Sequence, residues 1–206
     1  METEFKYKLN DENIFEKLVE DSEIFKEGKD NVEVINMKAY YFDTPENDFR
    51  NRGIAYRIRH ENDRITATIK WDIEDVDIKD GLHIREEFNL VVTDELFAEN
   101  PDIGLFKSSD AYDVLYNASG EKKLIKTIGM EYVRNQIKVD TGKSISCVSV
   151  DKGIIHHENG SDVPVYELEV EWFYGDEEDF ENLAKKIQEK YNLEVENISK
   201  LQRAFI

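Results

Sequence analysis

Cysteine and proline are scarce in this chain of 206 residues, which contains one cysteine and three prolines. The single thiol, Cys147, excludes an internal disulfide and a metal site built from several cysteines. Long apolar runs are missing too, since none approaches the roughly 20 residues that a membrane-spanning helix needs. The N-terminal residues also lack the basic and apolar regions of a signal peptide. We therefore expect a cytoplasmic protein without a membrane partner.

Basic residues are the minority among the charged ones. The chain has 27 lysines and arginines against 46 aspartates and glutamates, which gives a formal net charge of −19. A nucleic acid backbone requires a basic surface, so we expect no nucleic acid partner. A small anionic ligand is compatible with this charge, because charge inside a cleft can oppose the net charge. The hydrophobic content of 40% supports a folded core and argues against a disordered acidic polymer.

Charged and apolar residues alternate along most of the extended segments. Side chains of a strand point to opposite faces in turn, so Glu2 and Glu4 share one face of the first segment. The last segment repeats the pattern with Glu167, Glu169 and Glu171. Segments rich in β-branched and aromatic residues, punctuated by glycine, predict strands over 2–9, 35–43, 54–60, 64–73, 82–92, 131–139, 144–152 and 163–174.

Apolar residues at helical spacing predict helices between the strands. The two clearest helices cover 11–21 and 176–191, and shorter ones are expected over 94–99 and 109–118. The pattern across 94–130 is otherwise weak, and no role is predicted for this segment.

The distribution of charge along the strands predicts an unusual interior. No linker and no internal repeat divides the chain, so we expect one domain, 1–206. Apolar strand faces need a cover, which the amphipathic helices supply, and the charged faces then point inward. We therefore expect a β-rich α+β fold, a closed barrel of antiparallel strands with a polar lumen and helices packed outside. Because buried charge is costly unless compensated, a polyanion and a divalent metal are the expected filling.

Short motifs follow one another in order along the whole chain: Glu2–Lys6 (ExExK), Tyr41–Pro45, Gly53–Arg59, Thr68–Lys70, Arg85–Asn89, Glu167–Glu171 and Ser199–Lys200. Together they resemble the motifs of the CYTH superfamily, also called triphosphate tunnel metalloenzymes. Asn89 departs from the family pattern, because it replaces the last acid of an R-x-E-x-E strand. A lone ExExK is a weak signal, but ordered matches over the whole chain are specific. The resemblance implies an eight-stranded antiparallel tunnel that hydrolyses or cyclises a triphosphate with Mg²⁺ or Mn²⁺.

Carboxylates on the inner faces are the candidate metal ligands. Hard divalent cations prefer carboxylate oxygens, and acids two residues apart on one strand face project together, about 7 Å apart. The candidates are Glu2, Glu4, Asp151, Glu167 and Glu169. Asp151 enters this set because it resembles an additional acidic ligand of the family.

Basic residues on the inner faces are the candidate substrate-binding groups. They are Lys6, Arg57, Arg59, Lys70, Arg85, Arg134 and Lys200. Arginine suits phosphate because its fork binds two oxygens at once. For Arg57 and Arg59, ion pairs with acids on neighbouring strands are the alternative interpretation.

The candidate catalytic residues are Lys6, Tyr41, Glu169 and Glu171. The resemblance implies a pairing of Lys6 with Tyr41 near the site. Glu169 or Glu171 would position or deprotonate the attacking water. Glu171 has an alternative placement at the tunnel mouth, where it would be solvated.

Hydrolysis of inorganic tripolyphosphate is the expected function, with the protein a monomer or homodimer. Thiamine or nucleoside triphosphate hydrolysis, adenylate cyclisation and non-catalytic polyphosphate binding are the alternatives. Binding alone would need the cations but not the carboxylates. Strand parity places Trp71 and Trp172 on the outer faces, which leaves Tyr41 as the inner aromatic candidate for stacking a base. The bare triphosphate is therefore favoured.

Overall fold

The computed structural model describes residues 1–11, 13–25, 28–73, 80–156 and 160–206. Its strands are β1 (Glu2–Lys8), β2 (Glu33–Asp43), β3 (Ile54–Glu61), β4 (Arg64–Asp72), β5 (Leu82–Val92), β6 (Ile125–Asp140), β7 (Ser144–His156), β8 (Asp162–Gly175) and β9 (Glu194–Val195). Its helices are α1 (Ile14–Val19), α2 (Glu95–Glu99), α3 (Asp110–Ser119), α4 (Glu177–Tyr191) and α5 (Lys200–Arg203), with 3-10 turns η1 (Gly28–Asn31), η2 (Arg50–Arg52) and η3 (Ile103–Phe106).

Eight of the strands close into an antiparallel barrel, as predicted. They follow the order β5-β4-β3-β2-β6-β7-β8-β1, and the pairing of β1 with β5 closes the ring. β1 is shared along its length: Glu2–Phe5 pair with β5, whereas Tyr7 and Lys8 pair with β9. The short β9 therefore continues the wall of the barrel where β5 leaves β1.

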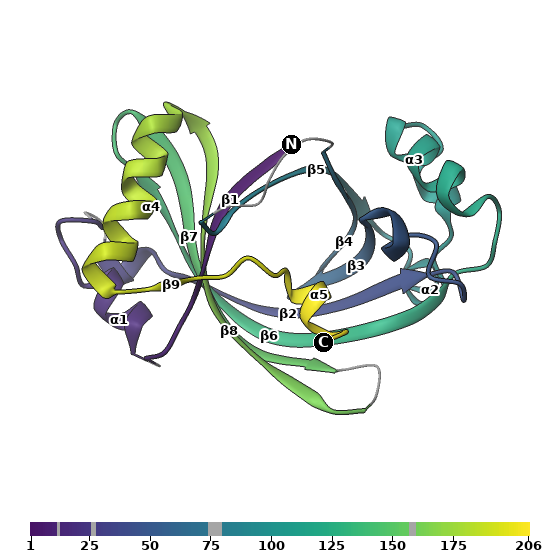
Figure 1. Cartoon of the computed structure of the whole chain (residues 1–206), viewed down its shortest axis with the longest axis horizontal. Helices are drawn as coiled ribbons and strands as arrows, with labels where there is room; N and C mark the ends of the chain where they lie inside the picture. The colour runs from purple at the N-terminus through teal and green to yellow at the C-terminus, as the bar shows by residue number, and fades with distance from the viewer. Residues whose placement is uncertain (12, 26–27, 74–79, 157–159) are drawn as a thin grey trace.

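Two groups of helices cover the outer faces of the barrel at opposite ends of the view (Figure 1). α1 and α4 bury Leu18 and Phe180 in a cluster with Leu168 of β8. η3 and α3 bury Phe106 and Leu115 in a second cluster, against strands β3 and β4. The segment 94–130, for which no role was predicted, thus supplies one of the two covers. Trp172 and Trp71 pack against these two clusters, which confirms their predicted outward placement.

A third apolar cluster lies inside the barrel, in addition to the charged residues that were predicted there. Met37, Met130 and Val165 come from inward-facing strand positions and are buried together. Leu201 and Phe205, at the C-terminal end of the chain, pack against them. Figure 1 shows α5, in yellow, within the ring of strands. One end of the interior is therefore apolar and plugged by the C-terminal segment, and only the remainder is ionic.

The boundaries of several elements differ from the predictions. β6 begins at Ile125, six residues before the predicted 131, because its first residues pair with the end of β2, where Ile125 lies opposite Asp43. The helix predicted over 11–21 is shorter, Ile14–Val19, and its residue 12 lies outside the described residues. β9 and α5 were not predicted, since two and four residues are too short to show a periodic pattern.

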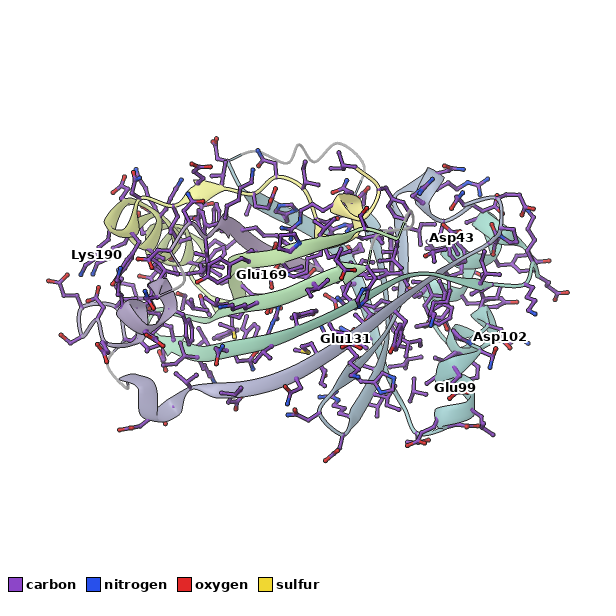
Figure 2. The ribbon with its side chains drawn as sticks, turned by 90° about the horizontal axis from the view of Figure 1, so that it is seen from below. Asp43, Glu99, Asp102, Glu131, Glu169 and Lys190 are labelled. Carbon is purple, nitrogen blue, oxygen red and sulfur yellow. The ribbon has the colours of Figure 1, made fainter. Side chains whose placement is uncertain are left out.

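None of the helices in the described part of the chain has the length and apolar character that crossing a bilayer requires. Charged residues instead divide between the surface and the interior. Figure 2 shows Lys190, Glu99 and Asp102 on the helical ends of the molecule, whereas Glu169 lies among the barrel strands. Glu169 is only 6% exposed, so its charge must be compensated from within the barrel.

Candidate active site

A cavity of about 200 Å³ lies inside the barrel and is lined by inward-facing residues of its strands. All the basic residues that were predicted to bind substrate line it: Lys6, Arg57, Arg59, Lys70, Arg85, Arg134 and Lys200. Glu2, Glu4, Tyr41, Glu169 and Glu171 line it as well. Asp151 and Glu167, which were also predicted as metal ligands, are buried beside it. Residues far apart in the sequence meet here because alternate positions of neighbouring strands share one face.

The carboxylates at one end of the cavity have too few cations near them. Glu4 and Glu171 are directly opposite each other on β1 and β8, where like charges repel. Glu4 pairs with Lys6 at 2.9 Å, and among the described residues Glu171 forms no ion pair. Burial, with a contribution from Glu2 and Glu169 that Lys6 opposes, raises the pKa of Glu4 to about 7. Burial and the charges of Glu2 and Glu4 raise the pKa of Glu171 to about 8.

This acidic end fits a divalent cation by the chemistry of its donors. Carboxylate oxygens are the ligands that Mg²⁺ and Mn²⁺ prefer. Glu2 adds a third carboxylate two residues from Glu4 on the same strand face. Burial opposes ionisation of Glu2, but Lys70 outweighs it and lowers the pKa of Glu2 to about 2. At this end of the cavity, Glu2 is ionised, and additional positive charge would favour ionisation of Glu4 and Glu171.

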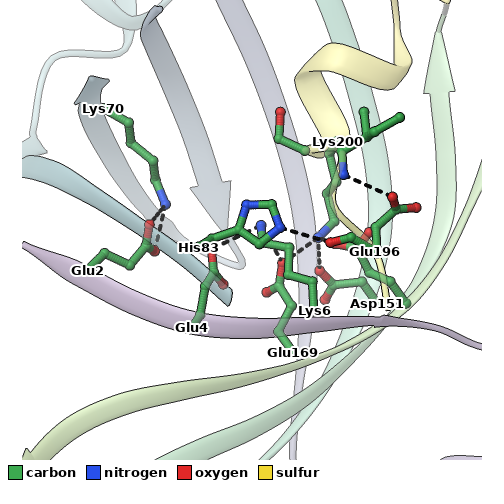
Figure 3. A network of polar contacts seen from close by, with 12 residues as sticks. Glu2, Glu4, Lys6, Lys70, His83, Asp151, Glu169, Glu196 and Lys200 are labelled. Carbon is green, nitrogen blue, oxygen red and sulfur yellow. Dashed lines mark hydrogen bonds and ion pairs between the residues drawn. The ribbon is translucent and has the colours of Figure 1, made fainter. Parts of the chain in front are cut away.

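A second group of carboxylates consists of Asp151, Glu167 and Glu169, and Figure 3 shows Asp151 and Glu169 of this group beside Lys200. Their oxygens lie within 4.8 Å of one another, a spacing that could hold a metal ion. Arg134, however, donates to both oxygens of Asp151 at 2.7 Å. Lys200 contacts all three carboxylates, at 2.8 Å from Asp151 and Glu169. We call these three residues the inner cluster; its charges are met by side chains of the protein.

Arg57 and Arg59 of β3 have too few acceptors near their guanidinium groups. Both line the cavity, and the Nε of each is buried without a hydrogen-bond partner. Arg57 donates weakly to Thr68 at 3.4 Å and forms no ion pair within the described part of the chain. Arg59 pairs with Glu61, two residues along its own strand, at 2.6 Å. Burial and then the charge of Arg57 lower the pKa of Arg59, so these guanidinium groups repel each other in the absence of an anion.

Lys6 joins the two groups of carboxylates. Its ammonium lies 2.9 Å from Glu4 and 3.3 Å from Glu169. Tyr41 lines the same cavity, but among the described contacts its hydroxyl forms no hydrogen bond with Lys6. The remaining predicted cations are held by acids: Lys70 by Glu2 and Glu87, and Arg85 by Asp72 at 2.9 Å.

Sequence reasoning missed several residues of this site. His83 lies two positions before Arg85 on the same face of β5, a parity that could have identified it. Its Nε2 lies 2.8 Å from the carbonyl oxygen of Glu196, and burial, followed by the charge of Lys6, lowers its pKa to about 4. The ring is therefore neutral and donates to this carbonyl. Glu87 and Tyr132 also line the cavity.

The chain belongs to the CYTH domain family, because the sequence model of that family matches residues 1–205. Solved structures share the fold at low identity. HpAC1 from Hippeastrum, described as having a dominant triphosphatase activity, is 18% identical with a TM-score of 0.71, over 98% of this chain and 93% of that one. A candidate adenylate cyclase from Bacillus halodurans is 19% identical with a TM-score of 0.66, over 100% and 98%. The mimivirus capping enzyme triphosphatase is 12% identical with a TM-score of 0.51, over 92% and 89%. A search of curated proteins finds no match.

The raised pKa values of Glu4 and Glu171 predict a stability that falls with pH. An ordinary glutamate has a pKa of 4.5, so the folded protein keeps protons that the unfolded chain has released. The stability contributed by protonated Glu4 and Glu171 is complete below pH 4.5 and is lost as the pH rises through about 7 and 8. We expect the melting temperature of EDTA-treated protein to fall as the pH rises from about 5 to about 8, and to fall less in Glu171→Gln. Glu178→Gln, at an exposed position of α4, is the control; equal slopes in both variants would contradict the assignment.

Proposed function

We propose that this protein hydrolyses a triphosphate inside the barrel with the aid of Mg²⁺ or Mn²⁺, and that inorganic tripolyphosphate is its preferred substrate. One observation carries the proposal. The cavity is lined by two carboxylates whose pKa values are raised by burial and by neighbouring acids, Glu4 and Glu171, and by two guanidinium groups whose buried Nε atoms have no hydrogen-bond partner, Arg57 and Arg59. A triphosphate with a divalent cation at one end supplies both charges at once. Family membership and the triphosphatase activities named for HpAC1 and the mimivirus enzyme support this assignment.

The phosphate chain would be bound mainly by the arginines of β3. Arg57 and Arg59 have unpartnered N–H groups, whereas Lys70 and Arg85 already hold carboxylates. A guanidinium binds two phosphate oxygens in a fixed geometry and stabilises charge that develops on them during phosphoryl transfer. We therefore assign the clamp to Arg57 and Arg59, with Lys70 and Arg85 flanking it.

The acidic end would hold the metal through Glu2 and Glu4, with Glu169 and Glu171 beside them. A divalent cation there would neutralise phosphate charge and lower the pKa of a bound water. Glu171 is the better proton acceptor of the two candidates, because Glu169 is engaged by Lys6, Lys200 and Arg134. Lys6, between Glu4 and Glu169, would orient both carboxylates toward the substrate. Asp151 and Glu167 are left out of this metal set, because side-chain cations already contact them.

The preference for a bare triphosphate follows from what surrounds the cavity. At about 200 Å³ it is smaller than the roughly 300–1,000 Å³ of pockets that bind organic ligands. Its tyrosines are Tyr41 and Tyr132. The ring of Tyr132 already forms a cation–π contact with Lys200, whose Nζ lies 5.6 Å from the ring centroid. A base or thiazolium ring gains affinity from stacking and apolar burial, which this cavity provides poorly.

A panel of substrates tests the function. Phosphate release is measured with tripolyphosphate, pyrophosphate, ATP and thiamine triphosphate under Mg²⁺ and Mn²⁺, with cyclic AMP assayed alongside. We expect kcat/KM for tripolyphosphate to exceed the others by at least roughly tenfold, or about 1.4 kcal/mol. Glu4→Gln should lower turnover on the order of a hundredfold or more, because it removes a charge from the metal site. Cyclic AMP as the main product would favour the cyclase alternative, and binding without turnover would favour a polyphosphate-binding module.

The clamp is tested by equilibrium binding of a non-hydrolysable triphosphate. Arg57→Met should weaken binding by about 1.5–3 kcal/mol, the scale of a charge-assisted hydrogen bond. Its affinity for Mn²⁺ alone should not decrease, because a guanidinium is not a metal ligand. Arg64→Met, at an exposed position of β4, is matched for the loss of charge and should bind as the parent does. Equal losses in the two variants would mean that Arg57 acts only through the net charge.

A further inference from the structure

Lys200 occupies the position that a metal ion would take in the inner cluster of Asp151, Glu167 and Glu169. Its ammonium contacts one oxygen of each carboxylate. Each carboxylate also offers an oxygen within 4.8 Å of an oxygen of the other two. All three acids are at most 6% exposed, and Lys200 is 8% exposed. The contacts with Glu167 and Glu169 are hydrogen bonds, and the contact with Asp151 is an ion pair.

The charges of the inner cluster balance without an added ion. Its three carboxylates face Lys200, Arg134, which binds Asp151 through two hydrogen bonds, and Arg203, which binds Glu167. A divalent cation placed among them would add positive charge to a group that is already neutral, at a high desolvation cost. Burial opposes ionisation of Lys200, but the three acids outweigh it and hold its pKa well above the ordinary value.

The local sequence explains how Lys200 reaches this position. Ser199 caps α5 by accepting a hydrogen bond from the Gln202 backbone, and the Gln202 side chain accepts one from the Ser199 backbone. Lys200 and Arg203 are three residues apart, so they share a face of this turn, and both contact Glu167. The Ser199–Lys200 pair thus combines a helix cap with a buried cation.

The segment that carries Lys200 forms hydrogen bonds with β1 and with residues at the start of β5, the two strands whose pairing closes the barrel. The backbone N–H of Glu196 donates to the carbonyl oxygen of Lys6 at 2.8 Å, and the Gly81 N–H donates to the Asn197 side chain at 3.0 Å. His83 donates to the carbonyl oxygen of Glu196 (Figure 3). Docking of residues 194–206 and neutralisation of the inner cluster therefore occur together.

We propose that Lys200 is the resident cation of the inner cluster and a positioning residue for Glu169, in place of a second metal ion and rather than a phosphate ligand. Glu169 belongs to the inner cluster and also lines the cavity, so the contact with Lys200 fixes a carboxylate that faces the substrate. The proposal rests on the proposed function only for the identity of that substrate.

The number of Mn²⁺ ions bound by EDTA-stripped protein tests this directly, measured from the EPR signal of free Mn²⁺ with no triphosphate present. Lys200→Met leaves three buried carboxylates without their shared cation, so we expect about one additional Mn²⁺ ion per chain compared with the parent. Lys200→Arg keeps the charge and should bind as many ions as the parent. Lys185→Met, on the exposed face of α4, is matched for charge and should also match the parent. Adding Glu167→Gln to Lys200→Met should abolish the additional site.

The competing role, phosphate binding by Lys200, gives a different result. If Lys200→Met binds the same number of Mn²⁺ ions as the parent and loses triphosphate affinity as Arg57→Met does, the proposal is wrong. It is equally wrong if Lys200→Met stays unfolded both without and with excess Mn²⁺, because the ion should replace the lost charge. A variant that folds only with Mn²⁺ supports it. Since no triphosphate is present in the metal-binding assay, failure here leaves hydrolysis untouched, and an inactive parent would not alter the ion count.

Discussion

Buried charges inside the barrel must be neutralised, and this requirement shapes the fold. A closed barrel with ionised groups inside is costly to fold unless each charge finds an opposite one. The protein meets this requirement for the inner cluster with Lys200, Arg134 and Arg203. At the cavity, Glu4 shares Lys6 with Glu169, Glu171 forms no ion pair among the described residues, and the buried Nε of Arg57 has no hydrogen-bond partner. That difference separates the groups that stabilise the fold from those available to a ligand.

The remaining elements hold this division in place. The helices on the outer faces bury apolar residues in two clusters, so the core that stabilises the barrel lies mostly outside it. The third cluster closes one end of the interior with Leu201 and Phe205. The C-terminal segment therefore contributes both apolar contacts and the cation of the inner cluster, which makes the last residues of the chain part of the candidate active site.

Much of this arrangement could be predicted from the sequence because it depends on a local rule. Strand periodicity alone places Glu4, Arg57 and Glu169 on inner faces, and the structure brings them to one cavity. Strand periodicity does not predict which acidic and basic side chains form ion pairs inside the barrel. Lys200 and Asp151 are 49 positions apart in the sequence, and their contact depends on the docking of a four-residue helix that shows no periodic signal. For the same reason the candidate metal ligands and the inner cluster could not be separated from the sequence.

The charges that line the cavity are complementary to a polyanion bound together with a metal ion. The melting temperature of EDTA-treated protein, measured with Mg²⁺ alone, with a non-hydrolysable triphosphate alone and with both, shows whether the cavity binds the two together. Ligands that bind only the folded state raise the melting temperature. We expect Mg²⁺ and the triphosphate together to raise the melting temperature by more than the sum of their separate effects, whereas Mg²⁺ with sulfate at equal ionic strength should not. If neither Mg²⁺ nor the triphosphate changes the melting temperature, the charged cavity does not bind them.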